Sequence, residues 1–326
     1  MWLEQPREDE VRAVTLEGYA AVLAPVRRHL GGVPIDEVTP RHVADLKAWL
    51  FASGGRATKA HPEGRPLSAR TVRGSLLHFR SALDMAVRLE MIGKNPAAGV
   101  KVAKQTRTAL HDVAHWSPGE LFRFRDHADG HPLAAAWRLT LCGLTRADLL
   151  GLRWSDVDLD AGTVTIRRGR VQLSMGGQRT VVDDTKSEDR KRTVPVEVLH
   201  AGTTALLRRY QLATGGRDDQ PVVVDEAGQP LRPERYSDLF RELSDAAGVP
   251  RIRLHAVRHS LAGWLHHEGV APVDAAALLG HTKQVQLASY VPRGGTAGIT
   301  AAAQALQAAQ RRMAGGEDAG QATGTL

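Results

Sequence analysis

Apolar side chains recur every three or four positions through much of the first hundred residues, which is the spacing of one face of an α-helix. This pattern predicts a helix over 15–30 and a second that starts at Thr39, with Pro40 in a first-turn position where its missing N–H costs nothing. A third helix is expected after Ser68. Between the last two, residues 54–66 are polar and contain glycine, so we expect an exposed loop.

A polar, basic stretch at 101–115 has little periodicity and is typical of a linker between domains. Directly after it, Ser117 and Glu120 have the spacing of a capping box, in which two side chains satisfy backbone N–H groups reciprocally. A new helix and a second domain should therefore begin here. We place a helical domain at 1–105, a linker at 106–116, a second domain at 117–300, and a C-terminal helix with a disordered tail at 301–326.

The second domain combines helical and strand patterns. A mostly apolar helical region, broken at Gly143, precedes an alternation of apolar and polar residues around Val164 that predicts a strand. Further strands are expected around 180–183 and 192–196, and helical patterns return from 233 onward. The chain should therefore pair an all-α N-terminal domain with a mixed α+β domain that is mostly helical and contains a small antiparallel sheet.

Charge and composition limit the classes of partner that the chain could bind. The formal net charge of +7 and the pI near 9.8 favour a polyanion, either nucleic acid or an anionic membrane surface. Arginine greatly outnumbers lysine; a GC-rich coding bias explains most of this excess, and paired binding of phosphate oxygens is the lesser alternative. The sole cysteine, Cys142, excludes an intramolecular disulfide framework and a cysteine-rich metal site. The polar N-terminus and the absence of a long apolar stretch indicate a soluble, cytoplasmic protein.

The residues most informative about chemistry lie in the last quarter of the chain. Arg258 and His259 lie three and four positions after His255, so on a helix they share a face with it and could converge on one anion. Tyr290 follows His281 closely and precedes a proline, so a short helix or loop could present its hydroxyl to that anion. These residues together predict a phosphate site with a nucleophile. We expect His259 to have a supporting role in this site rather than a catalytic one. A surface histidine pair, a metal site and a tyrosine packed in a core are the competing interpretations, although the pair lacks the glutamate of a zincin and a third ligand.

Several separated segments resemble the successive catalytic boxes of the tyrosine recombinases of the phage integrase kind, and they occur in the same order along the chain as in that family. Taken alone, Lys186 would be a solvated residue between two strands, but the joint match of the boxes is far more specific than any one of them. The N-terminal half is similar to the helical, SAM-like core-binding domain of that family, so the resemblance covers nearly the whole chain. The segments that carry it are 67–72, 94–96, 142–157, 184–195, 254–259, 279–281 and Tyr290.

The resemblance implies a role for each matching residue. Tyr290 would attack the scissile phosphodiester and form a 3′-phosphotyrosyl link, which divides one hard displacement into two easier ones. Lys186 would protonate the departing 5′ oxygen, and Arg258 would neutralise the non-bridging oxygens. His255 and His281 would donate hydrogen bonds or shuttle the proton of the nucleophile. Such an enzyme needs neither a metal nor another cofactor, because the covalent link conserves the phosphodiester energy.

The chain departs from the family pattern at one point. Where the opening box has a catalytic arginine, this sequence has Thr145, although Asp148 keeps the acidic position three residues later. In one interpretation, a local shift lets Arg146 take the role, and we assign it there. In the other, the position is lost and the rate falls about 10²- to 10³-fold, as for removal of one preorganised donor.

The resemblance also implies partners. We expect a clamp of two domains on double-stranded DNA with specific recombination sites, a homotetramer on two duplexes, and an accessory directionality factor. The helix at 299–313 could pass to a neighbouring protomer or simply face solvent. The alternatives are a catalytically impaired DNA-binding protein on the same scaffold and a type IB topoisomerase-like enzyme. A metal-dependent nuclease ranks below both.

Overall fold

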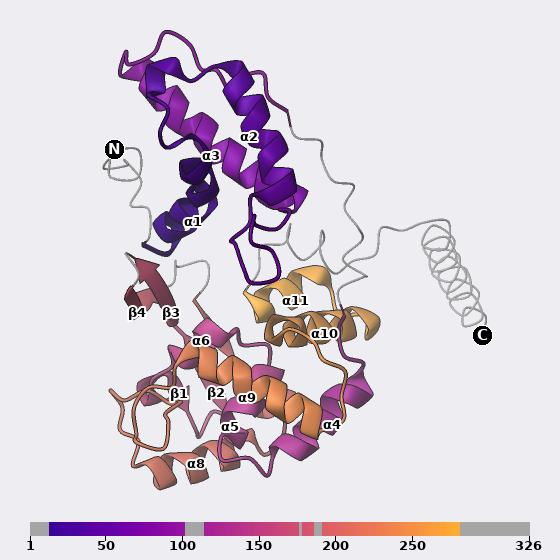
Figure 1. The fold of residues 1–326 in the computed structure, drawn as a ribbon. Helices are drawn as coiled ribbons and strands as arrows, with labels where there is room; N and C mark the ends of the chain where they lie inside the picture. The colour runs from indigo at the N-terminus through magenta and orange to yellow at the C-terminus, as the bar shows by residue number, and fades with distance from the viewer. Residues whose placement is uncertain (1–12, 102–113, 176–177, 186–190, 281–326) are drawn as a thin grey trace, which may run out of the picture. The chain divides into compact units, whose positions relative to one another are not determined.

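The computed structural model describes residues 13–101, 114–175, 178–185 and 191–280 (Figure 1). Two compact units are formed. One contains the described parts of 1–109 and 145–242, and the other those of 110–144 and 243–326. The expected helix at 299–313 lies outside the described residues, as does most of the expected linker. The boundaries given above for the domains therefore stay a prediction.

Residues 13–101 form three main helices around a small core (Figure 1). Thr39 caps the second helix by accepting a hydrogen bond from the backbone N–H of His42, and Pro40 occupies the first turn as expected. Val43, Leu46 and Leu50 lie on one face of this helix and are fully buried. The predicted helices and their buried stripe are confirmed as α1 Ala13–Leu30, α2 Pro40–Ser53 and α3 Ala69–Arg88, and an unpredicted short 3-10 helix, η1 Ile35–Glu37, precedes α2.

Residues 145–242 hold the strands, which form two small antiparallel sheets in the orders β1-β2-β5 and β3-β4. The expected strand around Val164 is confirmed, and its residues alternate between buried and half-buried. The strands expected at 180–183 and 192–196 also form, but they do not make a hairpin, because one pairs with β3 and the other with β2. The strands are β1 Val157–Asp158, β2 Thr163–Ile166, β3 Arg168–Met175, β4 Gln178–Thr185 and β5 Arg192–Val194.

A buried carboxylate fixes the junction between β2 and β3. The side chain of Asp156 is 1% exposed and accepts hydrogen bonds from Arg167 Nη1 at 2.7 Å and from Arg168 Nη1 at 2.6 Å. The backbone N–H of Arg153 donates to the same carboxylate at 3.0 Å. A buried charge needs such partners, and these bonds hold Arg167 and Arg168 where β2 ends and β3 begins. The helical elements of this region are α6 Arg146–Leu150, η3 Trp154–Asp156, α7 Val196–Leu199, α8 Thr203–Thr214 and α9 Pro233–Ala246.

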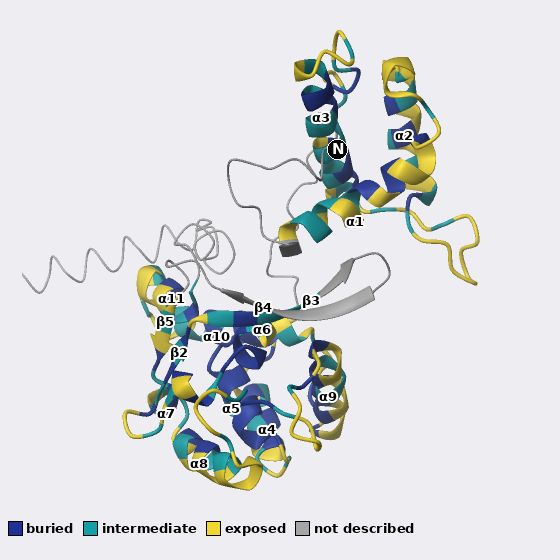
Figure 2. Cartoon of the chain, turned by 90° about the vertical axis from the view of Figure 1, so that its left-hand side faces the viewer, coloured by how far each residue is buried: buried dark blue, intermediate teal, exposed yellow. Residues whose placement is uncertain are grey.

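The second unit is helical in its described part and has an aromatic core. The predicted capping box is present, because the N–H of Ser117 donates to Glu120 Oε2 at 2.7 Å and the serine hydroxyl accepts from the N–H of Glu120. Trp116 is buried and donates from Nε1 to the carbonyl oxygen of Pro250 at 2.8 Å. Figure 2 shows helix α5, residues Ala134–Leu141, almost entirely buried. The helices are α4 Pro118–Ala128, α5 Ala134–Leu141, α10 Leu254–His267 and α11 Pro272–Leu279.

The expected fold class is confirmed: a helical N-terminal part precedes a mostly helical part with small antiparallel sheets. Among the described helices, none has the length and apolar character needed to cross a lipid bilayer.

Candidate active site

Arg258 is a buried cation held by a backbone carbonyl. The residue lies on α10, is 4% exposed, and donates from Nη1 to the carbonyl oxygen of Gly143 at 2.6 Å. Gly143 has a φ of +84°, and a Cβ at this position would lie 2.7 Å from Cδ2 of Leu279. Only glycine combines this backbone conformation with so little space. The glycine therefore aims its carbonyl at the guanidinium and fixes its position.

Two histidines lie beside this cation on the same helix. The ring centroids of His255 and His259 are 5.0 Å apart and their planes are almost perpendicular, which confirms the predicted helical spacing. Burial, together with electrostatic repulsion from His255, Arg258 and His115, lowers the pKa of His259 to about 4. His259 is therefore neutral near pH 7, whereas the exposed ring of His255 faces solvent. The convergence of these residues on one anion stays a prediction.

Thr145, which stands where the family pattern has an arginine, caps helix α6. Its hydroxyl accepts from the N–H of Asp148 at 3.2 Å, and its own N–H donates to Asp148 Oδ2 at 3.1 Å. The same carboxylate oxygen lies 3.2 Å from Nη2 of Arg192, in a pair whose side chains are 3% and 11% exposed. Threonine thus has a structural role here, and Asp148 links the start of α6 to β5.

Arg146 is exposed and reaches the first two turns of α9. Its Nη1 donates to the hydroxyl of Ser237 at 2.8 Å and to the carbonyl oxygen of Pro233 at 3.3 Å. The segment does begin a helix at this residue, as expected. Whether Arg146 fills the role of the missing arginine stays a prediction.

Three predicted site residues, Lys186, His281 and Tyr290, lie outside the described residues. The other three of the four tyrosines are described, and two are poor nucleophiles. Tyr236 is fully buried, and burial raises the pKa of Tyr210, although a hydrogen bond with Val224 opposes this shift. The ring of Tyr19 packs on His78 with centroids 4.4 Å apart.

Sequence reasoning missed the partners of the opening box. Arg192 belongs to a segment that carried the resemblance, but nothing in the sequence indicated its pairing with Asp148. Ser237 gave no signal, because a serine in a helix is ordinarily a solvated residue. No group of three or more potential metal ligands occurs among the residues that the structure describes.

Comparison with known proteins gives consistent results. The model of the phage integrase family matches residues 124–293, and that of the phage integrase SAM-like domain matches residues 3–104. The tyrosine recombinase XerC of Xylella fastidiosa (strain M23) is 28% identical over 82% of each chain. A XerC-like tyrosine recombinase of Caldanaerobacter subterraneus is 23% identical over 69% of this chain and 62% of its own length.

Solved structures share the fold at low identity. The Tn1549 transposon integrase in complex with transposon right end DNA has a TM-score of 0.69 and 18% identity, over 92% of this chain and 96% of its own. A lambda integrase dimer bound to a core site has a TM-score of 0.59 and 18% identity, over 88% and 92% of the two chains. With one family model covering more than half of its residues, the chain belongs to the phage integrase family of tyrosine recombinases.

Proposed function

We propose that this protein cleaves and rejoins DNA strands at specific sites through a covalent link to Tyr290. The phenolic oxygen attacks the scissile phosphorus, the bond from phosphorus to the 5′ oxygen breaks, and Lys186 supplies the proton that the leaving oxygen takes up. A 5′ hydroxyl then attacks the phosphotyrosine, which restores the phosphodiester and releases the enzyme. No metal or other cofactor enters this reaction.

The observation that carries the proposal is the fixed, buried guanidinium of Arg258. Developing charge on the non-bridging oxygens is stabilised best by a donor that need not reorganise, and the hydrogen bond to Gly143 meets this requirement. His255 lies one helical turn before this arginine, on the same element. We assign Arg258, His255 and His281 to the phosphate, and Arg146 to the position of the missing arginine.

We also propose the partners of this protein by analogy with its relatives. A lambda integrase structure is described as a tetramer bound to a Holliday junction, and similar assembly here would place four protomers on two duplexes. An accessory directionality factor and a cytoplasmic location belong to the same proposal. The domains at 1–105 and 117–300 would then hold one duplex between them.

The test is covalent capture from a mixture of genomic sequences, so the target site need not be known. The full chain is incubated with genomic DNA fragments, denatured, and the DNA that remains attached to protein is sequenced. Wild type and Tyr19→Phe should yield adducts at a common sequence in the presence of EDTA, and Tyr290→Phe should yield none. Adducts from Tyr290→Phe, or their loss with EDTA, would refute the proposal.

One observation favours a second candidate, a DNA-binding protein of this scaffold with impaired cleavage. Thr145 is committed to the cap of α6, and Arg146 is bonded to Ser237 and Pro233. If Arg146 has the catalytic role, Arg146→Ala lowers the adduct yield about 10²- to 10³-fold. An unaffected Arg146→Ala combined with a large gain from Thr145→Arg would instead support the impaired protein.

A further inference from the structure

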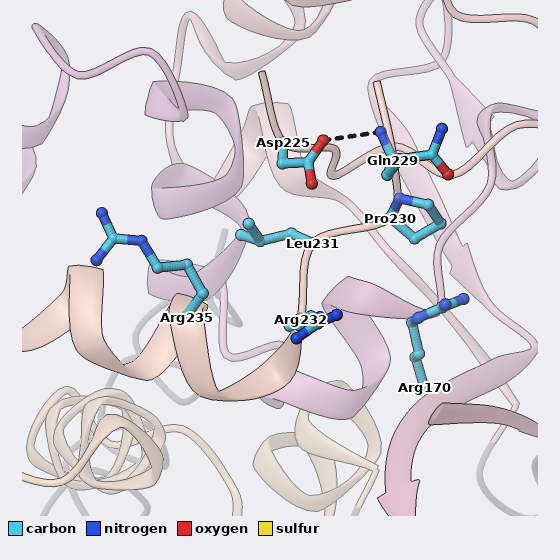
Figure 3. Close-up of a pocket in the computed structure, with 7 residues that line it drawn as sticks. All are labelled: Arg170, Asp225, Gln229, Pro230, Leu231, Arg232 and Arg235. Carbon is cyan, nitrogen blue, oxygen red and sulfur yellow. Dashed lines mark hydrogen bonds between the residues drawn. The ribbon is translucent and has the colours of Figure 1, made fainter. Parts of the chain in front are cut away.

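An open pocket of about 450 Å³ lies between β3, a tight turn at 225–229 and the start of α9 (Figure 3). This volume is within the range of roughly 300–1,000 Å³ that is usual for ligand sites. None of its side chains is among the six proposed for catalysis. The lining residues are Arg170, Asp225, Gln229, Pro230, Leu231, Arg232 and Arg235.

Three arginines and one carboxylate give the pocket a positive charge, and the carboxylate is already committed. Asp225 Oδ1 accepts from the N–H groups of Ala227 at 3.0 Å and Gln229 at 2.9 Å, which closes the turn. Its charge is therefore directed into its own backbone, as Figure 3 shows for the bond to Gln229. The pocket retains an excess of cationic groups that an anion would balance.

The arginines differ in their partners. Arg235 Nη1 lies 2.9 Å from Oε1 of Glu242, in a pair that is more than half exposed and therefore weak. Arg232 is exposed and makes no side-chain hydrogen bond or ion pair with any other residue that the structure describes. Figure 3 shows Arg232 between Arg170, which rises from β3, and Arg235, whose side chain points away from both. Arg170 and Arg232 both line the pocket on the side away from the Arg235 ion pair, so we take them as the pair that would bind one anion.

The pocket is connected to the proposed catalytic residue Arg146 through α9. Arg232 directly precedes Pro233, whose carbonyl oxygen accepts from Arg146, and Ser237 on the next turn accepts a second hydrogen bond. A group bound between Arg170 and Arg232 would lie at the same end of α9 as this contact. The pocket and the proposed catalytic residue Arg146 therefore both contact the start of α9.

We propose that this pocket binds a backbone phosphate of duplex DNA, gripped by Arg170 and Arg232, as an anchoring site separate from the six catalytic candidates. The inference rests on the proposed function, because it takes DNA as the partner. A guanidinium fork matches the paired oxygens of a phosphate, and Pro230 and Leu231 offer an apolar wall for the adjoining sugar. The open form of the pocket suits a chain of phosphates better than a small enclosed ligand. Contacts of this kind position the duplex without reading its sequence.

The experiment measures DNA affinity as a function of salt for the full chain. Binding to a labelled duplex of about 30 base pairs, roughly three helical turns, is followed by fluorescence anisotropy between low and moderate salt. Loss of one phosphate contact lowers the slope of log affinity against log salt by about 0.9. Arg170→Ala/Arg232→Ala should show this decrease, Arg232→Ala a smaller one, and Arg232→Lys should keep most of the wild-type slope.

Arg241→Ala is the matched control, because Arg241 is exposed on α9, which begins directly after Arg232, and is paired with Asp238 outside the pocket. It should retain the wild-type slope. A wild-type slope in the double variant, or an equal decrease in the control, would overturn the proposal. So would a pocket-dependent rise in thermal midpoint with inorganic phosphate and no change in the DNA slope, which would indicate a site for free anions.

Covalent capture of DNA by wild type separates this inference from the proposed function. Adducts together with an unchanged slope in the double variant reject the pocket and leave the function standing. A decreased slope without any adduct rejects strand cleavage and leaves the pocket standing. Arg232 is exposed, so Arg232→Ala should fold normally and serves if the double variant does not.

Discussion

Replacing Asp148 by asparagine tests the electrostatic link between α6 and β5. The carboxylate is 3% exposed and lies 3.2 Å from Nη2 of Arg192, which is 11% exposed. Asparagine keeps an oxygen that can accept from the N–H of Thr145, so the cap of α6 is largely retained. What Asp148→Asn removes is the negative charge that faces a nearly buried guanidinium.

Loss of one member of a buried ion pair typically costs about 3–5 kcal/mol, because the remaining charge is left in a poorly solvated place. Arg192 reaches some solvent, and the retained cap is worth about 1 kcal/mol. We therefore expect Asp148→Asn to lower the free energy of unfolding by about 2–3 kcal/mol. Urea unfolding followed by tryptophan fluorescence measures this change, with Trp154, which is 3% exposed, as a reporter in the same unit.

A double-mutant cycle with Arg192→Met isolates the pair. The two changes should be non-additive by more than about 1 kcal/mol, as expected for residues in contact. The control is Asp160→Asn, whose exposed pair with Arg208 should leave the urea midpoint unchanged. The reasoning fails if Asp148→Asn behaves like this control, or if the two changes add within about 0.5 kcal/mol.

Substitutions at three further positions address the site directly. Gly143→Ala forces a side chain into a left-handed conformation at a cost of roughly 1–2 kcal/mol and displaces the carbonyl that holds Arg258, so unfolding midpoint and adduct yield should both fall; no change in either contradicts it. Thr145→Ala should lose about 0.5–2 kcal/mol of stability and Thr145→Ser almost none, and equal thermal midpoints for the two would argue against the cap. Because the folded state disfavours protonated His259, wild type should lose stability as pH falls from 6.5 to about 4, with His259→Gln flatter in a series of urea midpoints. Parallel pH curves would count against a depressed pKa.

The sequence predicted well those elements whose signal is local. The caps at Thr39 and Ser117 depend on residues only three positions away, and the buried stripe of α2 follows from the spacing of its apolar residues alone. Helix α8 went unpredicted, because it buries only Thr203 and Leu207 and so has a weak apolar face. Strand β3 was missed as well, since glycine and arginine near its start obscure its alternation.

Strand pairing and side-chain contacts depend on residues far apart in the chain, so they were harder to predict from the sequence. Nothing near Lys186 indicated that β4 and β5 belong to different sheets. The helical placement of His255 and Arg258 could be predicted, but not the bond from Arg258 to Gly143, which joins residues more than a hundred positions apart. The substitution at Thr145 was visible in the sequence, whereas its use as a helix cap required the structure.

The burial of Cys142 has a practical consequence for labelling. This is the only cysteine of the chain, and at 1% exposure its thiol is screened from reagents in the folded protein. A single cysteine introduced on the surface, for example at Arg241, would therefore take up a fluorophore or spin label selectively while the native cysteine stays in place. Pairs of such positions, one in each unit, would give the distances between them on and off DNA.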